Sequence, residues 1–245
     1  MSLPASPTVV LVHGAFADAS GYAPVIRELK AAGIRAIAPA VPNRSLLGDS
    51  AYIASVVRAI PGPVVLVGHS YGGAVITVAG TEDNVQALVY LAGYALEEGE
   101  SLGELQGRFP DSDLAGALVY TPFPIEGSTE TGTDVSVEAE RFAEVFAADV
   151  DPELAAVLAV SQRPLAAAAF GEAAPAAAWR TKPSWGVVAT SDRTINPEVE
   201  RYGYERAGMT IVEVDSSHLV MLSQPQRVAE LIQEAVRTTA DATAH

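Results

Sequence analysis

Short apolar runs alternate with amphipathic stretches in the first third of the chain, and the same alternation returns after residue 183. The runs are apolar at successive positions and rich in β-branched residues, which is typical of strands covered on both faces of a sheet. Six strands are predicted in this way: Thr8–Val12, Arg35–Ala38, Val64–Val67, Ala87–Leu91, Trp185–Ala189 and Thr210–Val214.

The stretches between these runs have apolar residues at helical spacing. In the first stretch Ser20 is a possible N-cap and Gly33 a stop signal, and in the second Asp49 can cap the helix. Strands that alternate with helices predict a parallel sheet with helices on both faces, in an α/β fold. The further helices that we expect in the core are Ala74–Ala79, Glu198–Arg206 and Pro225–Val236.

The alternation stops at residues 95–183, which we interpret as an insertion between two halves of a core, 1–94 and 184–245. Residues 97–153 contain fifteen of the thirty acidic residues and only two arginines. Such a charge run is usually a solvated surface, so we expect no ligand-binding cluster there. The stretch Leu118–Thr133 is rich in Pro, Gly and Thr and predicts an irregular connection. The insertion is expected to be mostly helical, with helices at Val137–Ala148, Pro152–Val160 and Pro164–Ala169.

The composition limits the chemistry that the chain can perform. It has 245 residues, a net charge of −15 and no cysteine, which excludes disulfides, thiolate metal sites and a cysteine nucleophile. The acidic balance argues against nucleic acid and anionic membranes as partners. Residues 1–8 have no apolar stretch typical of a secretory leader, and a buried strand and helix explain the uncharged run Val64–Thr81 better than a membrane span does. We expect a cytoplasmic globular protein, monomeric or homodimeric.

The sequence Gly68-His69-Ser70-Tyr71-Gly72 lies between a predicted strand and a predicted helix. A G-x-S-x-G string at such a turn is typical of a nucleophilic serine, because small residues on either side let the chain reverse sharply. The turn aims the Ser70 hydroxyl away from the sheet, and the following helix points its N-terminus at the reaction centre. Ser70 is therefore the candidate nucleophile.

A serine hydroxyl needs a base to accept its proton, and the chain has four histidines. His245 ends the chain. His69 adjoins Ser70 on the strained turn and cannot readily fold back onto it. His13, at the end of the first strand, is assigned a structural role. His218 remains, in a loop after the sixth strand at the carboxyl edge of the sheet, and it is the candidate base.

The third member of a catalytic triad is a carboxylate that orients the imidazole. Asp192 follows the fifth predicted strand at the same edge, and the chain order Ser, Asp, His matches the arrangement of hydrolases with this motif. Asp215 is an alternative, but it stands only three residues before His218 and is expected to face elsewhere. Asp192 could instead be an N-cap for the segment after Pro197. We favour Asp192 as the triad acid.

Two backbone amides are expected to stabilise the negative charge that develops on the reacting carbonyl oxygen. One belongs to Tyr71, the residue after the nucleophile. The other comes from the loop after the first strand, where we choose Ala15 because Gly14 lets the backbone approach the substrate closely. The candidate walls of the substrate pocket, each of which could equally be ordinary core, are Phe16, Tyr94, Phe123 and Leu219.

With these residues the sequence resembles the α/β-hydrolases, and within them the small esterases and hydroxynitrile lyases related to plant methylesterases. The resemblance implies a mainly parallel six-stranded sheet, an inserted cap at residues 95–183 that roofs the active site, and no need for a metal or an organic cofactor. The matching segments are LVHGAFADAS (11–20), LVGHSYGG (66–73), ALVYLAGYALEEGES (87–101) and ATSDRTINPE…DSSHLVMLSQPQRVAELI (189–232).

Two departures from that resemblance separate the subgroups. Plant-type hydroxynitrile lyases carry a threonine after the first-strand histidine and a lysine after the catalytic histidine, whereas this sequence has Gly14 and Leu219. Without the cation that stabilises departing cyanide, the chain resembles the esterase branch. We expect a serine carboxylesterase that hydrolyses a small or medium neutral or hydrophobic ester through an acyl-enzyme. The alternatives are a hydroxynitrile lyase, a cofactor-free perhydrolase or a slow-turnover ligand sensor on the same scaffold.

Overall fold

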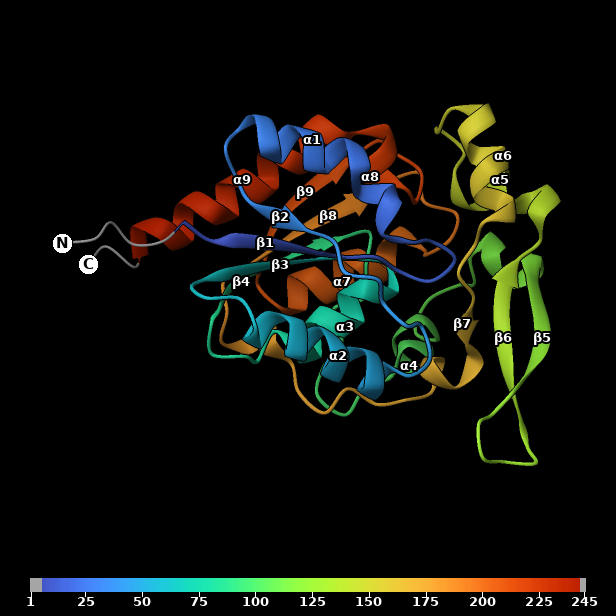
Figure 1. Ribbon diagram of the computed structural model, residues 1–245. Helices are drawn as coiled ribbons and strands as arrows, with labels where there is room; N and C mark the ends of the chain where they lie inside the picture. Colours follow the sequence, from blue (N-terminus) through green and yellow to red (C-terminus); the bar gives the residue numbers. More distant parts are fainter. Residues whose placement is uncertain (1–5, 243–245) are drawn as a thin grey trace.

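The computed structural model describes residues 6–242 and contains a six-stranded sheet in the order β2-β1-β3-β4-β8-β9 (Figure 1). Each pairing between neighbouring strands is parallel. Every predicted strand contributes to this sheet, which confirms the α/β fold. The strands are β1 (Thr8–Val12), β2 (Ala36–Ile37), β3 (Val64–His69), β4 (Val85–Leu91), β8 (Ser184–Ala189) and β9 (Thr210–Val214).

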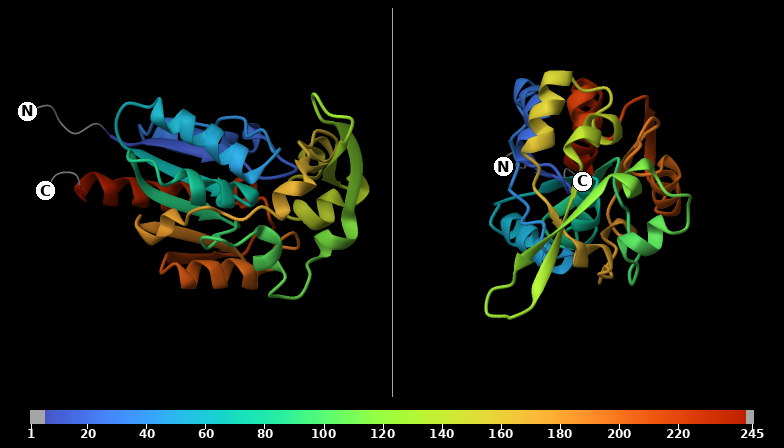
Figure 2. Two further views of the ribbon diagram at one scale, coloured as in Figure 1. Left: turned by 90° about the horizontal axis from the view of Figure 1, so that it is seen from below. Right: turned by 90° about the vertical axis from the view of Figure 1, so that its right-hand side faces the viewer.

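Helices cover both faces of the sheet, with α1 and α9 on one side and α2, α3 and α7 on the other (Figures 1 and 2). This double cover explains why β1 and β3 are buried at every position and are apolar at almost all of them. The core helices are η1 (Ala19–Tyr22), α1 (Ala23–Ala31), α2 (Leu46–Arg58), α3 (Tyr71–Ala79), α7 (Pro197–Arg206), α8 (Val220–Ser223) and α9 (Pro225–Ala242).

Two of the predicted N-caps are wrong. Asp18 caps the short helix η1, and its side chain accepts the Ser20 amide at 2.7 Å, so Ser20 is already inside the helix. Ser45 caps α2 through the Gly48 amide at 3.1 Å. Asp49 lies within the first turn of α2 and is only 1% exposed, because its carboxylate accepts hydrogen bonds inside the protein.

The segment between β4 and β8 contains a second, antiparallel sheet in the order β5-β6-β7. The predicted irregular connection at Leu118–Thr133 is wrong, because β5 (Leu118–Pro124) and β6 (Thr131–Val137) pair along their whole length. Residues 125–130 join the two strands, and Gly127 among them has a φ of 73°, in the left-handed region that favours glycine. The segment rich in Pro, Gly and Thr is therefore a β-hairpin.

The rest of this segment is built of short helices and one further strand. The helix predicted at Pro164–Ala169 is wrong: β7 (Leu165–Ala166) pairs with β6, and the Ala166 amide donates to the Asn43 carbonyl at 3.0 Å. The helices are α4 (Leu102–Gln106), η2 (Asp113–Ala117), α5 (Ala139–Phe146), α6 (Pro152–Val160), η3 (Ala167–Phe170) and η4 (Ala178–Arg180).

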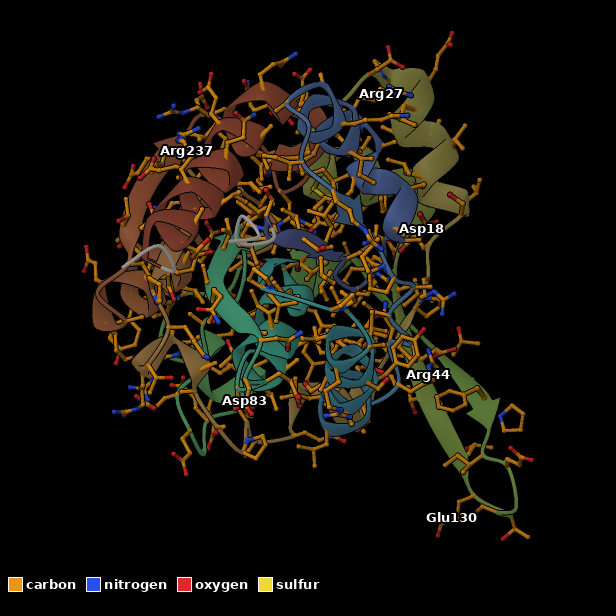
Figure 3. The ribbon with its side chains drawn as sticks, turned by 60° about the vertical axis from the view of Figure 1, so that its left-hand side comes forward. Asp18, Arg27, Arg44, Asp83, Glu130 and Arg237 are labelled. Carbon is orange, nitrogen blue, oxygen red and sulfur yellow. The ribbon has the colours of Figure 1, made fainter. Side chains whose placement is uncertain are left out.

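The hairpin, α5 and α6 lie across the carboxyl edge of the parallel sheet, the edge at which β3 ends in the serine motif (Figures 1 and 2). In Figure 3 the hairpin projects from the body, with Glu130 at its tip and Arg44 beside its base. Arg44 joins the hairpin to the core in two ways. It forms an ion pair with Asp134 at 2.7 Å, and its guanidinium lies over the Phe123 ring in a cation–π contact, 4.8 Å from the ring centre. Among the described residues, no helix is long and apolar enough to cross a bilayer.

Candidate active site

Ser70 stands at the abrupt junction between β3 and α3. Its φ of 54° and ψ of −124° lie in a region that residues with a side chain rarely adopt, and such a conformation costs about 1–3 kcal/mol. The amide of Ser70 donates to the Leu91 carbonyl at 3.1 Å, and its carbonyl accepts the Gly73 amide at 2.9 Å. Backbone bonds on both sides therefore hold the serine in its strained position.

The second glycine of the motif is required by a close approach of two chain segments. A Cβ atom on Gly72 would lie 2.3 Å from the Val12 carbonyl oxygen at the end of β1. The start of α3 thus packs directly on the neighbouring strand, which is why the turn can be so sharp. The N-terminus of α3 consequently faces the space above Ser70.

His218 and Asp192 meet in the interior, although 26 positions separate them. The Nδ1 atom of His218 lies 2.5 Å from Asp192 Oδ2, and both side chains are 0% exposed. Asp192 Oδ1 accepts the amides of Thr194 and Ile195 at 2.7 and 3.0 Å. These bonds fix the carboxylate, and the helix that follows is capped by Asn196 instead, so Asp192 is not its N-cap.

The second ring nitrogen of His218 is positioned to accept a proton. With Nδ1–H donating to Asp192, Nε2 carries the lone pair, and it is buried with no hydrogen-bond partner among the described residues. The structure does not place a hydrogen bond between Ser70 Oγ and this nitrogen. Both residues stand at the carboxyl edge, where His69, next to Ser70, packs its ring 4.6 Å from that of His218.

The rival acid faces solvent. Asp215 is exposed, and its Oδ1 accepts a hydrogen bond from the Ser191 hydroxyl at 2.8 Å. Among the described residues, the hydrogen bond from His218 Nδ1 goes to Asp192 and not to Asp215. The structure therefore pairs His218 with Asp192 and leaves Asp215 outside the site.

The amides chosen for the oxyanion hole are both unoccupied. Neither the Ala15 nor the Tyr71 N–H donates to another residue in the described part of the chain, whereas the next amide, that of Phe16, donates to the Arg163 carbonyl at 2.9 Å. A Cβ on Gly14 would lie 2.7 Å from Ser70 Cβ, so this loop touches the nucleophile. One of these amides comes from the loop after β1, and the other belongs to the residue that follows Ser70.

The orientation of the Ala15 amide is set through the carbonyl of the same peptide group. The Gly14 carbonyl oxygen accepts from His13 Nδ1 at 2.9 Å and from Asn43 Nδ2 at 3.2 Å. Because a trans peptide is planar, its N–H points opposite to its carbonyl, so these two donors also aim the Ala15 N–H. His13 Nε2 accepts the Val41 amide at 2.9 Å, which agrees with a structural role for His13.

A buried carboxylate anchors the other candidate donor. The Tyr71 hydroxyl donates to Asp49 Oδ2 at 2.8 Å, and the Arg44 amide donates to the same carboxylate. Burial is the largest cause that raises the pKa of Asp49 above its ordinary value. The short stretch that contains Asn43 and Asp49 thus contacts both proposed donors of the oxyanion hole.

The sequence did not identify several residues that contact the candidate site, among them Asn43, Asp49 and Phe146 of α5, whose ring lies 4.8 Å from that of His218. The sequence could have indicated Asp49, because it is a single acidic residue beside the apolar face of its helix. Asn43 and Phe146 had no such signal, because their roles depend on contacts between segments distant in the chain.

The four candidate pocket walls do not form one cluster. Phe16 and Leu219 line the same small hollow, and the ring of Phe16 contacts that of Phe146 at 5.9 Å. Tyr94 is buried; its hydroxyl donates to Gln106 at 2.7 Å, and its amide donates to the Ser70 carbonyl at 3.3 Å. Phe123 lies out on the hairpin, opposite Gly132.

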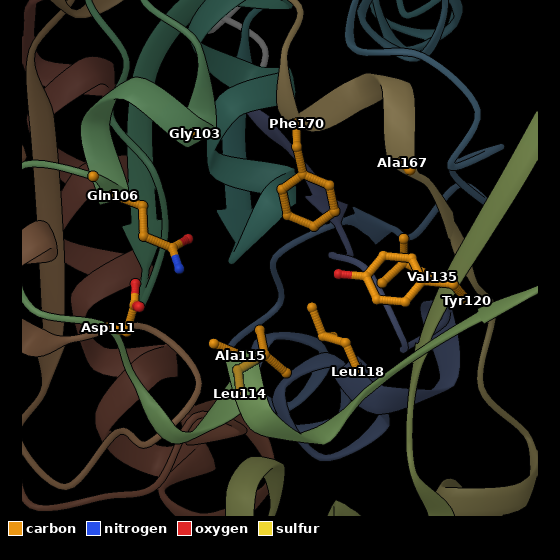
Figure 4. Close-up of a pocket in the computed structure, with 11 residues that line it drawn as sticks. Gly103, Gln106, Asp111, Leu114, Ala115, Leu118, Tyr120, Val135, Ala167 and Phe170 are labelled. Carbon is orange, nitrogen blue, oxygen red and sulfur yellow. The ribbon is translucent and has the colours of Figure 1, made fainter.

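A cavity of about 380 Å³ lies within the insertion, and all of the residues that line it belong to 95–183. Figure 4 shows Phe170 and Tyr120 on one side of it, with Gln106 and Asp111 on the opposite side. Gln106 is the residue that Tyr94 joins to the backbone of Ser70. The apolar side chains in the wall are Leu114, Ala115, Leu118, Val135, Ala167 and Phe170.

Within the described range, no group of three or more histidine and acidic side chains is arranged to hold a metal ion.

The arrangement of the sheet, the serine turn and the His–Asp pair agrees with a comparison to known sequences. The model of the alpha/beta hydrolase family matches residues 9–231. This chain belongs to that family. It is a hydrolase enzyme by family membership, as the serine motif predicts.

Three relatives illustrate the family likeness. A carbendazim hydrolyzing esterase of Nocardioides sp. (strain SG-4G) is 27% identical, over 90% of this α/β hydrolase and 96% of the relative. The structure of a pyrethroid hydrolase from Sphingobium faniae JZ-2 is 22% identical with a TM-score of 0.75, and covers 96% of this chain and 99% of its own. That of polyneuridine aldehyde esterase is 18% identical with a TM-score of 0.81, at 94% and 99% coverage. At these identities the two structures establish a shared fold.

Proposed function

We propose that this α/β hydrolase is a serine carboxylesterase that hydrolyses small or medium neutral esters. The observation that carries the proposal is the His218 imidazole, whose Nδ1 is held by Asp192 at 2.5 Å while its buried Nε2 has no partner among the described residues. A base held in this tautomer, at the sheet edge where a strained serine stands, is suited to activate a hydroxyl group. Two of the relatives described above are named as esterases.

The acylation step follows from these positions. Ser70 Oγ attacks the ester carbonyl carbon as His218 Nε2 accepts its proton, and Asp192 stabilises the resulting imidazolium. The tetrahedral oxyanion accepts hydrogen bonds from the Ala15 and Tyr71 amides, each typically worth about 3 kcal/mol. His218 then gives its proton to the alcohol oxygen, the carbon–oxygen bond breaks, and an acyl-enzyme remains.

Deacylation repeats the same sequence with water as the nucleophile. His218 removes a proton from a water molecule, which attacks the acyl carbonyl carbon. The same two amides stabilise the second oxyanion. Its collapse returns the proton from His218 to Ser70 Oγ and releases the acid.

The substrate preference is inferred from the cavity and its surroundings. In this proposal residues 95–183 act as a cap, and the cavity of about 380 Å³ inside the cap holds part of the substrate. Its wall is mainly aliphatic and aromatic, and its charged member, Asp111, repels anions. Sixteen of the thirty acidic residues lie in this insertion. A neutral ester with an apolar acyl or alcohol group therefore fits better than a carboxylate or phosphate.

The test is a series of p-nitrophenyl esters of increasing acyl length, assayed with the wild type and with Ser70→Ala. We expect steady turnover by the wild type, a maximum at short to medium acyl chains, and loss of at least about 10³-fold in Ser70→Ala. Mass spectrometry of the stopped reaction should find the acyl group on the peptide that contains Ser70.

Other outcomes contradict the proposal in distinct ways. If Ser70→Ala keeps most of the activity, the nucleophile is wrong. A single burst without turnover would indicate a ligand sensor, and cyanide release from mandelonitrile without ester hydrolysis would indicate a lyase.

A further inference from the structure

A second carboxyl group is buried behind the candidate triad. Glu200, on α7, is 0% exposed. Its Oε2 accepts the amide of Ala189, at the end of β8, at 2.9 Å. Its Oε1 is buried and receives no hydrogen bond from a donor group among the described residues. A fully buried glutamate with one unmatched oxygen is costly if it is ionised.

Glu200 lies close to the carboxyl of Asp192, within the range of a side-chain interaction. Two carboxylates are both acceptors, so this contact requires a proton on one of them. Asp192 already accepts three N–H donors, including His218 Nδ1, so both of its oxygens act as hydrogen-bond acceptors. The proton therefore belongs to Glu200.

The other groups around Glu200 do not favour its ionised form. Tyr94, after β4, and Tyr204, on α7, face the same buried space and carry no positive charge. The nearby cation is Arg201, which is engaged at the surface by Glu213 and Glu198. Burial and the neighbouring Asp192 accordingly raise the pKa of Glu200 well above its ordinary value.

We propose that Glu200 is a positioning residue of the triad: its neutral carboxyl donates a hydrogen bond to Asp192 and holds that carboxylate toward His218. The inference rests on the proposed function insofar as it assigns the triad to Asp192 and His218. A neutral donor leaves a single negative charge behind the imidazole. An ionised Glu200 would add a second charge and make the imidazolium harder to deprotonate.

The kinetic test compares Glu200→Leu with Glu200→Gln in pH profiles of kcat/KM. Glu200→Leu removes the donor, so we expect kcat to fall about 10-fold or more with KM nearly unchanged, and the acid limb of the profile to move to higher pH. Glu200→Gln keeps a neutral donor for Asp192 and an acceptor for the Ala189 amide, so it should restore kcat to within about 3-fold and leave the acid limb in place. The control is Glu100→Gln, which breaks a buried ion pair with Arg206 far from the triad and should not move the profile.

Two kinetic results would overturn the inference. If Glu200→Gln moves the acid limb to lower pH by about one unit, Glu200 is ionised in the wild type, because removal of a negative charge makes the imidazolium more acidic. If Glu200→Leu has the kcat and the pH profile of the wild type, Glu200 does not position the triad.

An equilibrium measurement reports on the proton without any turnover. In the Ser70→Ala background, urea unfolding is measured with and without Glu200→Gln at pH 5.5 and pH 8. A glutamate that stays protonated when folded loses its proton on unfolding at pH 8, so its contribution to stability falls as pH rises, while glutamine does not titrate. We expect Glu200→Gln to gain stability relative to its parent between the two pH values, and the absence of a gain would overturn the inference. This unfolding result does not depend on esterase activity. A failure of the proposed function can therefore be distinguished from a failure of the inference about Glu200.

Discussion

The Nε2 atom of His69 lies 2.9 Å from the backbone carbonyl oxygen of His218, so the residue before the candidate nucleophile is hydrogen-bonded to the candidate base. Burial, and secondarily His218 itself, lower the pKa of His69 well below 6.5. His69 is therefore neutral, and its Nε2–H is the donor in this bond. The contact ties the serine turn to the histidine loop across 149 positions of sequence.

Removal of this bond should reduce catalysis more than substrate binding. In His69→Leu we expect kcat to fall about 10-fold with little change in KM, because the loop of His218 loses a buried hydrogen bond worth about 1–3 kcal/mol. His69→Gln can donate to the same carbonyl and should recover part of the loss. Steady-state kinetics and thermal unfolding of both variants check this. A His69→Leu enzyme with the kcat of the wild type would show that the bond does not position the base.

The two aspartates near His218 should differ sharply when each is changed to asparagine. Asp192→Asn should lower kcat/KM by about 10³-fold or more, because an amide no longer holds the imidazole in the required tautomer. Asp215→Asn is the matched control and should stay within about 3-fold, since Asp215 is exposed and contacts Ser191. The reverse order of effects would move the triad acid to Asp215.

Asn43 should affect the transition state through the Ala15 amide. Asn43 has a φ of 58°, which glycine also adopts, so Asn43→Gly removes the side chain without backbone strain. We expect kcat to fall about 10-fold at constant KM, because the Gly14 carbonyl loses a donor that orients the oxyanion hole. Inhibition by a phosphonate that mimics the tetrahedral state should weaken by a similar factor.

The control for this variant is Asn84→Ala. The Asn84 amide donates to the Val57 and Ile60 carbonyls, remote from the serine. Its loss should lower the melting temperature and leave kcat and inhibition unchanged. Equal changes in KM and kcat for Asn43→Gly, with no change in inhibition, would count against the role of Asn43.

Acidification should remove the stability that neutral His69 contributes. Its folded pKa is lowered below the unfolded value of 6.5, so this contribution is present above pH 6.5 and is lost as the pH falls through the folded pKa, with a slope of at most about 1.4 kcal/mol per pH unit. His69→Gln does not titrate, so its destabilisation relative to the wild type should shrink between pH 7.5 and 5.5. Urea unfolding of the two proteins at each pH measures this difference in the free energy of unfolding. Glu200 is present in both proteins, so its own pH-dependent contribution to stability cancels. A constant difference would mean that His69 is not buried as neutral imidazole.

Much of the parallel core could be read directly from the chain. Each apolar, β-branched run forms a strand, because a segment buried on both faces must be apolar at every position, and this requirement is local. The Gly-x-Ser-x-Gly turn is equally local, since its small residues are demanded by contacts within a few ångströms of Ser70. The hairpin at residues 118–137 was missed because most positions of its strands are exposed or only half-buried, and the strands are rich in residues typical of loops.

The sequence alone determined the sheet, the strained serine and the candidates for base and acid. Only the tertiary structure shows that His218 pairs with Asp192 and not with Asp215, and only it places Asn43 and Asp49 beside the candidate oxyanion hole and Glu200 beside Asp192. The reason is that strand patterns depend on which residue faces the interior, whereas a hydrogen bond depends on where two distant segments meet. The positions that shape the reacting groups are therefore set by the packing of loops and helices at the carboxyl edge of the sheet.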